Sequence, residues 1–297
     1  METLRGAVYG LSAASIWGGM YVVSDVVLDT IPPFSLLTLR LLLGALVLAL
    51  LRLGQSGNPE GLKLPGARVV RYLGVGLVGF GFSLGAQFVG TALSTAINGA
   101  LITSASPAFI LLFAALLLRE RLQPVHLTAI SLATIGVLVI INPAQAELGG
   151  PNFLGDVALA IAALTWGLYS VLARLVGRSG DTLLVTLYAL IGGLFVTIPA
   201  SFIELAANPV DTNQIDLSVI LGVLYLGIVS TAGAMWLWNR AFALVAASTA
   251  SLFFFAQPLV GALLSVALLS QAMTSALWLG SALIVLGVLI ALVSRRA

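Results

Sequence analysis

The sequence contains no cysteine and very little charge. Of its 297 residues none is Cys, one is His and 8% are Asp, Glu, Lys or Arg, whereas a soluble domain carries about 25% charged residues. Without cysteine the chain can form no disulfide, thiolate metal site or thiol nucleophile. The histidine, His126, begins a predicted helix, and no acidic residue falls in the middle of one. Enzymes that work within membranes need a nucleophile with its base, two acids or a metal set, so we expect no enzyme, no metal and no cofactor.

Apolar residues are what the chain has in abundance. They make up 60% of it, and the mean hydropathy is +1.13. A soluble protein of this composition would have too few polar groups to cover its surface. The net charge of +2 is also too small to indicate a nucleic-acid partner. The first apolar run continues past the length of a signal-peptide core, so we expect it to be retained. The composition predicts an all-α integral membrane protein in contact with the lipid bilayer.

Ten apolar stretches are each expected to cross the bilayer as a helix. Short segments with turn residues, such as Pro32-Pro33 and Asn208-Pro209, separate them. The predicted spans cover residues 6–28, 34–53, 70–91, 95–118, 124–142, 153–175, 182–202, 217–239, 246–269 and 275–294. The gaps between them leave no room for a soluble domain.

The basic residues are distributed unevenly between the two ends of these spans. With ten spans, twelve of the thirteen Lys and Arg residues fall on the side that holds both termini, and only Arg40 does not. The cytoplasmic loops of membrane proteins are enriched in Lys and Arg. We therefore expect both termini to be cytoplasmic.

A bent apolar segment occurs twice in the chain. Residues 92–121 carry Pro107 within a run of about two dozen uncharged residues, and residues 244–271 carry Pro258 at the matching position. A proline removes one backbone hydrogen bond from a helix and bends it. In a bilayer the carbonyl that is freed must face protein or a wet cavity, not lipid. Both prolines are therefore expected to shape a cavity or a gate.

Other motifs follow the same repeat. Trp17-Gly18 recurs as Trp166-Gly167, so the chain divides into two five-helix units, residues 1–145 and 146–297. Because five is odd, the second unit must enter the membrane inverted. Secondary transporters use such inverted repeats, with the binding site near the bilayer midplane. We therefore expect ten transmembrane helices arranged as two inverted five-helix repeats.

These motifs resemble those of the EamA family of the drug/metabolite transporter superfamily over nearly the full length. The matching pieces are Trp17-Gly18, the PFSLLTLR run that ends in Arg40, Ser106-Pro107, the LLRERL end of the fourth span, Gly136-Val137, Trp166-Gly167, Gln257-Pro258 and Leu286-Gly287-Val288. The sequence departs from the family pattern at Gln271, where Glu is usual, and at Tyr188, which corresponds to Arg40.

The resemblance implies a bacterial inner-membrane exporter of small metabolites, with amino acids, aromatic ones included, as the best-known substrates. Broad selection among neutral amino acids is the natural expectation. Cationic drugs and nucleobases are alternative cargo, and a membrane-embedded enzyme or receptor is a distant alternative. The sequence leaves the oligomeric state open, and a monomer is expected to suffice for transport.

Aromatic residues are the first candidates for the lining of a substrate cavity. Trp17 shares a helix face with Tyr21, and Trp166 shares one with Tyr169. Both tryptophans fall near mid-helix, so they either line a cavity or act as packing wedges. Other aromatic residues lie near helix ends, where an interfacial belt explains them best, although one of them, Trp236, also stays a cavity candidate; they are Tyr72, Trp236, Trp238 and Trp278.

Uncharged polar residues are the second group of cavity candidates. They either orient a ligand or form hydrogen bonds between helices; they are Gln87, Asn98, Ser104, Asn239 and Gln257. Pro107 and Pro258 free the carbonyls of Thr103 and Phe254, and these could receive an ammonium group. Spans 1, 3, 4, 6, 8 and 9 are expected to line the cavity, rather than spans 5 and 10.

Arg40 is the only basic residue within a predicted span. A buried charge in a membrane is costly unless it is paired, so it is a functional candidate. Arg40 could hold a substrate carboxylate, or it could form a structural pair with Asp25 at similar depth. The sequence favours the pair, because the second half has only Tyr188 at the corresponding place.

Overall fold

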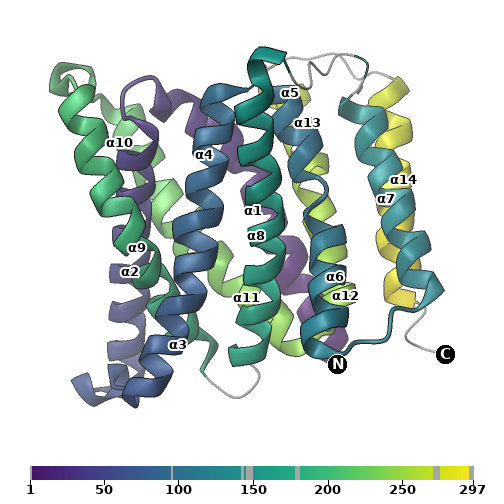
Figure 1. Ribbon diagram of the computed structural model, residues 1–297, viewed down its shortest axis with the longest axis horizontal. Coiled ribbons are helices and arrows are strands. Elements are labelled where there is room, and N and C mark those ends of the chain that lie inside the picture. The colour runs from purple at the N-terminus through teal and green to yellow at the C-terminus, as the bar shows by residue number, and fades with distance from the viewer. Residues whose placement is uncertain are drawn as a thin grey trace.

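The computed structural model describes residues 2–94, 96–141, 144, 150–177, 181–269 and 275–293. The regular structure of these residues is entirely helical (Figure 1). The first half forms α1 (Glu2–Leu28), α2 (Pro33–Ser56), α3 (Gly66–Gly76), η2 (Leu77–Ser83), α4 (Leu84–Leu93), α5 (Ala96–Thr103), α6 (Ser106–Leu118) and α7 (Pro124–Ile141). The second half forms α8 (Phe153–Gly177), α9 (Thr182–Ala207), α10 (Leu217–Leu224), η6 (Tyr225–Gly233), α11 (Ala234–Leu244), α12 (Ala247–Ala250), η7 (Ser251–Phe255), α13 (Ala256–Leu269) and α14 (Ser275–Val293).

Several of these helices are long and apolar enough to cross a membrane. In the described part of the chain there are five such helices: Pro33–Ser56, Gly66–Leu93, Gly150–Gly177, Thr182–Ala207 and Leu217–Leu244. Further apolar helices are shorter, among them Ser106–Leu118 and Pro124–Val139. The prediction of an all-helical membrane protein is therefore confirmed, whereas the number of ten spans stays a prediction.

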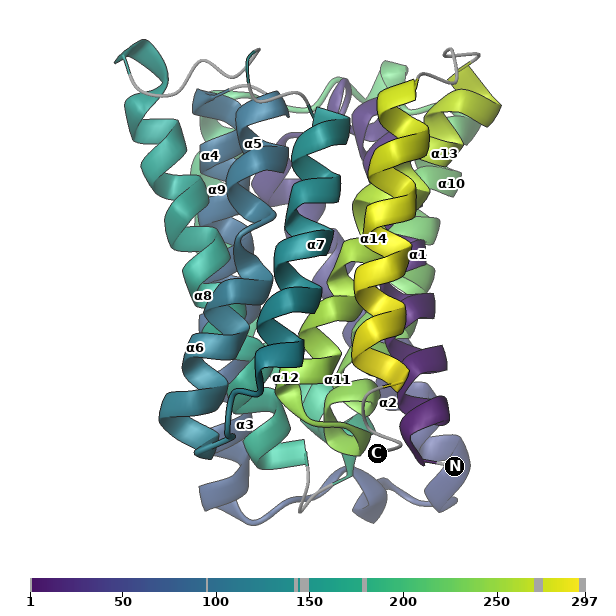
Figure 2. The ribbon, with the colours of Figure 1, turned by 90° about the vertical axis from the view of Figure 1, so that its right-hand side faces the viewer.

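The helices stand side by side in one bundle. α2 packs on α9, α1 packs on α11 and α13, and α8 packs on both α4 and α6. α7 and α14 pair with each other at one edge of the bundle, where they face the viewer in Figure 2. The start of α1 and the end of α14 lie at the same end of the bundle (Figure 2).

Glycines allow α7 and α14 to approach closely. A Cβ atom on Gly136 would lie 2.6 Å from the carbonyl oxygen of Gly280, and one on Gly287 would lie 2.6 Å from that of Ala129. Contact at that distance is repulsive, so a larger residue at either position would force the two helices apart. These two glycines are the ones that recur between the halves of the sequence.

Two of the long helices contain a wider, π-helical segment at matching places. Helix Gly66–Leu93 contains η2, and helix Leu217–Leu244 contains η6. Their first residues, Leu77 and Tyr225, are 148 positions apart (225 minus 77). Such segments are frequent at functional sites, because the added residue turns the following side chains to a new direction. Both segments contact the site described below.

The predicted bend at Pro107 is a complete break in the helix. α5 ends at Thr103 and α6 begins at Ser106, so Pro107 stands in the first turn of a new helix, where its missing N–H costs nothing. The hydroxyl of Ser106 donates a hydrogen bond to the carbonyl of Thr103 at 2.7 Å. That carbonyl was expected to be available to a ligand, and the structure shows that a neighbouring side chain already satisfies it.

A half-buried carboxylate at each end of the bundle accepts hydrogen bonds from the start of another helix. Near the end at which α1 begins, Glu120 accepts from the backbone N–H groups of Ala247 and Ser248, and its carboxylate lies 3.2 Å from Arg174 Nε. At the opposite end, Glu204 accepts from the backbone N–H groups of Phe34 and Ser35. Both carboxylates satisfy donors that the first turn of a helix leaves unpaired.

Candidate functional site: a cavity in the middle of the bundle

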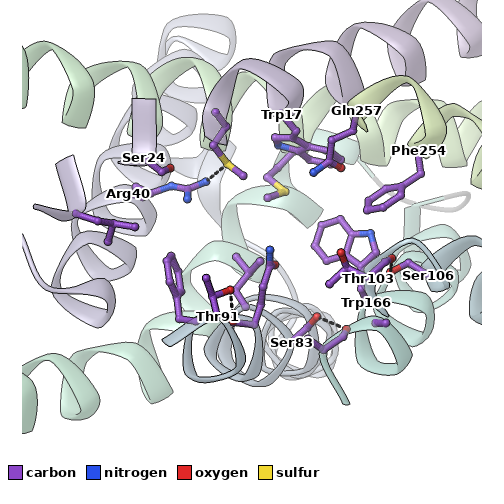
Figure 3. Close-up of a pocket in the computed structure, with 18 residues that line it drawn as sticks. Trp17, Ser24, Arg40, Ser83, Thr91, Thr103, Ser106, Trp166, Phe254 and Gln257 are labelled. Atoms are coloured by element: carbon purple, nitrogen blue, oxygen red, sulfur yellow. Dashed lines mark hydrogen bonds between the residues drawn. The ribbon is translucent and has the colours of Figure 1, made fainter. Parts of the chain in front are cut away.

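A cavity of about 140 Å³ lies between the helices (Figure 3). Seven of the residues that the sequence singled out line it: Trp17, Arg40, Gln87, Thr103, Trp166, Phe254 and Gln257. The cavity is smaller than the ~300–1,000 Å³ typical of pockets for drug-sized molecules. The cavity therefore suits a small metabolite.

The described lining comes from both halves of the chain. It includes residues of α1, α2, α8 and α13, of the helix containing η2, and of the broken segment around Pro107, but none of the described residues of α7 or α14. Leu28, the last residue of α1, and Thr91, near the end of α4, also line it. The cavity therefore extends toward the end of the bundle opposite the start of α1.

Three tryptophans pack together at the inner part of the site. The ring centroids of Trp17 and Trp166 are 5.6 Å apart, and Trp238 lies 5.3 Å from Trp17 and 6.4 Å from Trp166. Trp238 and Tyr72 are buried, so the structure overturns their expected place in an interfacial belt. The reason for Trp238 is that α11 packs between α1 and α8 rather than facing lipid. Trp278 is 65% exposed, as a belt residue would be.

The two repeat-related tryptophans differ in whether the indole N–H has a hydrogen-bond partner. Trp17 Nε1 donates to the carbonyl of Ser230, in η6, at 3.0 Å. Trp166 Nε1 is buried and has no hydrogen-bond partner among the described residues. A buried donor without an acceptor costs about 1–3 kcal/mol. Trp166 Nε1 is therefore an unpaired donor that is itself buried, although its ring lines the cavity.

Arg40 lies at the other side of the cavity in Figure 3 and is only 4% exposed. Its Nε donates to Thr231 Oγ1 at 3.2 Å and its Nη2 to Met20 Sδ at 3.1 Å. Within the described part of the chain Arg40 forms no ion pair. The side chain of Asp25, its predicted partner, lies outside what the structure describes. The described contacts of Arg40 are therefore with neutral groups.

Other predicted site residues lie away from the cavity lining. The hydroxyl of Tyr169, which is fully buried, donates to Asn239 Oδ1 at 3.0 Å, and Asn239 Nδ2 donates to Thr186 Oγ1 at 3.0 Å. Asn98 Nδ2 donates to Asp156 Oδ1 at 2.9 Å. These amides and hydroxyls connect helices, which was the alternative function considered for them.

The remaining predicted residues are buried or half-buried outside the cavity lining, or have side chains that the structure does not describe. Trp236 packs against Tyr9, with ring centroids 6.0 Å apart, near one end of the bundle. Ser104 is half-buried and outside the described lining, and Pro107 and Pro258 flank the cavity segments without lining it. The side chain of Tyr21 lies outside the described residues.

The chain matches the EamA-like transporter family twice, over residues 4–142 and 153–293. The chain belongs to this family. An uncharacterized transporter of Bacillus subtilis, YyaM, is 30% identical over 238 residues, which are 78% of this chain and 76% of that protein. The aromatic amino acid exporter YddG of Ancylobacter novellus is 26% identical over the full length of both proteins. A solved crystal structure superposes with a TM-score of 0.81 at 25% identity, over 98% of each chain.

This EamA-like protein is thus a membrane-spanning transporter and not an enzyme. Its cavity also contains residues that the sequence analysis missed, among them Met20, Ser83 and Met235. Ser83 closes η2 and donates to the carbonyl of Ala162 at 2.8 Å. It corresponds to Thr231 in η6, 148 positions later (231 minus 83). A search for small polar residues conserved between the two halves would have found this pair.

Proposed function

We propose that this EamA-like transporter is an exporter of small metabolites, most of all aromatic and other neutral amino acids, and that it works by alternating access around the central cavity. The observation that carries this proposal is the cavity between the two halves, lined by Trp17 and Trp166. Aromatic rings with a few hydrogen-bonding groups suit an amphipathic solute. YddG of Ancylobacter novellus, named as an aromatic amino acid exporter, is similar over the whole chain.

The arrangement in the membrane is part of the proposal. The chain would cross a bacterial inner membrane ten times as two inverted five-helix repeats, with both termini cytoplasmic. Support comes from the double family match and from the π-helical segments at matching places. In this orientation the cavity, which extends toward Leu28 and Thr91, would face outward.

Cationic cargo fits the cavity less well than a neutral or zwitterionic solute. Arg40 is the one charged residue among the described lining residues. A cation would enter a low-dielectric space that already holds a positive charge with no ion pair to the described residues, and such repulsion is only weakly screened inside a protein. An amino acid carries a carboxylate that can approach the guanidinium.

Counterflow in proteoliposomes tests the proposal. Vesicles containing the purified chain are loaded with unlabelled phenylalanine and diluted into labelled phenylalanine. We expect the label to accumulate above the level in protein-free vesicles, and unlabelled threonine or methionine to compete with it. A folded, monodisperse sample that exchanges no amino acid would refute the proposed cargo and direct the search to nucleobases and other small solutes.

A further inference from the structure

We infer that the cavity selects its solute by a carboxylate, which Arg40 binds, while the ring of Trp166 packs against the apolar body of the same solute. This rests on the proposed transport function and names the chemical class of its cargo: small carboxylates with an apolar or aromatic body. The carboxylate is the group that the site requires.

The guanidinium of Arg40 has donors to spare. An arginine side chain carries five N–H donors. Two of them are used by Thr231 Oγ1 and Met20 Sδ, and a thioether sulfur is a weak acceptor. The described chain supplies no negative charge to a guanidinium that is 4% exposed. Burying a charge without a counter-ion is unfavourable. A solute carboxylate would supply the counter-ion, and it can accept two parallel N–H bonds from the free edge of the planar guanidinium.

The π-helical segment η6 fixes the direction of the Arg40 guanidinium. The hydroxyl of Thr231 donates to the carbonyl of Leu226 at 2.7 Å, so its oxygen presents a lone pair to Arg40 Nε. Because Nε is bound to Thr231, the edge formed by Nη1 and Nη2 at the end of the guanidinium stays available to the solute. Thr231 is therefore a positioning residue for Arg40.

Trp166 supplies the second contact. Its ring lines the cavity. Figure 3 shows Arg40 and Trp166 on opposite sides of the cavity, with Trp17 between them. A solute with an apolar or aromatic body at one end and a carboxylate at the other fits this arrangement.

Three ligands of similar size distinguish the charge requirement in the full-length protein. Phenylalanine carries a carboxylate and an ammonium, phenylacetate only the carboxylate, and phenylalaninamide only the ammonium. Binding is measured as the rise in melting temperature of the purified protein with ligand concentration. We expect phenylalanine and phenylacetate to stabilise the protein and phenylalaninamide not to.

Variants identify the residues responsible. Arg40→Gln should weaken phenylacetate binding by about 30-fold or more, since one partner of a buried charge pair is lost, and should remove the preference over phenylalaninamide. Arg40→Lys keeps the charge and should restore part of the preference. Trp166→Ala removes the ring that packs on the apolar body and should weaken phenylacetate binding by about tenfold or more, whereas Trp278→Ala, on the exposed surface, should change nothing.

Equal stabilisation by phenylalaninamide and phenylalanine would overturn the inference, as would an Arg40→Gln variant that folds and keeps the preference. Because these experiments measure binding, their outcome does not depend on the counterflow assay of transport. A wild-type protein that exchanges phenylalanine but binds the amide equally well would refute the carboxylate requirement and leave the transport function intact.

Discussion

Single side chains in this protein divide into those that face the cavity and those that hold the helices together. Tyr169, Asn239 and Thr186 form a buried chain of hydrogen bonds between α8, α11 and α9. Every group in such a chain depends on its neighbour, because water is excluded. Replacing one of these groups should therefore affect stability and leave the solute contacts unchanged.

Tyr169→Phe tests this separation. The change leaves Asn239 Oδ1 without its donor, so we expect the free energy of unfolding to fall by about 1–3 kcal/mol, seen as a lower melting temperature in detergent. The rise in melting temperature that phenylalanine causes should stay within twofold of the wild type. Tyr9→Phe, in a half-buried ring near one end of the bundle, is the matched control. A loss of ligand binding without a loss of stability would place Tyr169 in the binding site instead.

At the scale of helices, close approach depends on particular glycines. In α3, a Cβ atom on Gly76 would overlap the backbone carbonyl of Ala189 in α9, whereas one on Gly74 would meet nothing within 4 Å. The two positions lie on one helix, two residues apart, and so share its intrinsic propensity. The tertiary contact alone should distinguish them.

Alanine at these positions should therefore have opposite effects. Gly76→Ala forces α3 away from α9 and should destabilise the protein by about 1–3 kcal/mol. Gly74→Ala should be neutral or stabilising by up to about 1 kcal/mol, because alanine favours the helix. Thermal unfolding of the two variants in the same detergent measures the difference. Equal melting temperatures would show that α3 and α9 pack less closely than the structure indicates.

At the scale of the whole molecule, each end of the bundle has a glutamate whose carboxylate binds the start of a neighbouring helix. Glu120 binds the start of α12 and pairs with Arg174, which also donates to the carbonyl of Phe242. Glu204 binds the start of α2 at the opposite end. Alternating access requires one end to open while the other stays closed. We expect the Glu120 contacts to keep the end near the start of α1 closed.

Glu120→Ala should open that end selectively. Because the chain has no cysteine, a single Cys in place of Ala250, which is fully buried in α12, reports on opening. Loss of charge-assisted bonds of about 1.5–3 kcal/mol each should raise its labelling rate by a thiol reagent about tenfold or more. Glu204→Ala is the control and should leave the rate unchanged. Equal acceleration by both variants would show general loosening rather than a gate at one end.

Composition and the position of Pro107 were enough to predict the class of the protein and a bend in its fourth span. Sparse charge and long apolar runs indicated membrane helices, because backbone groups in lipid must satisfy each other within a helix. Pro107 predicted a bend in the fourth span, since proline removes a backbone hydrogen bond, and the structure has a complete break there. The recurrence of Trp17-Gly18 and of the glycines at 136 and 287 indicated the family.

The tertiary structure decided which polar and aromatic side chains meet. Gln87 and Gln257 line the cavity, whereas Asn98 and Tyr169, equally plausible by sequence, join helices behind it. Nearly every face of these helices is apolar, so hydrophobic periodicity cannot separate a face toward lipid from a face toward protein. The π-helical segments η2 and η6 add a further shift in direction that no regular helical repeat contains. The contacts of Arg40 with Thr231 and Met20 likewise follow only from the way α1, α2 and η6 pack around it.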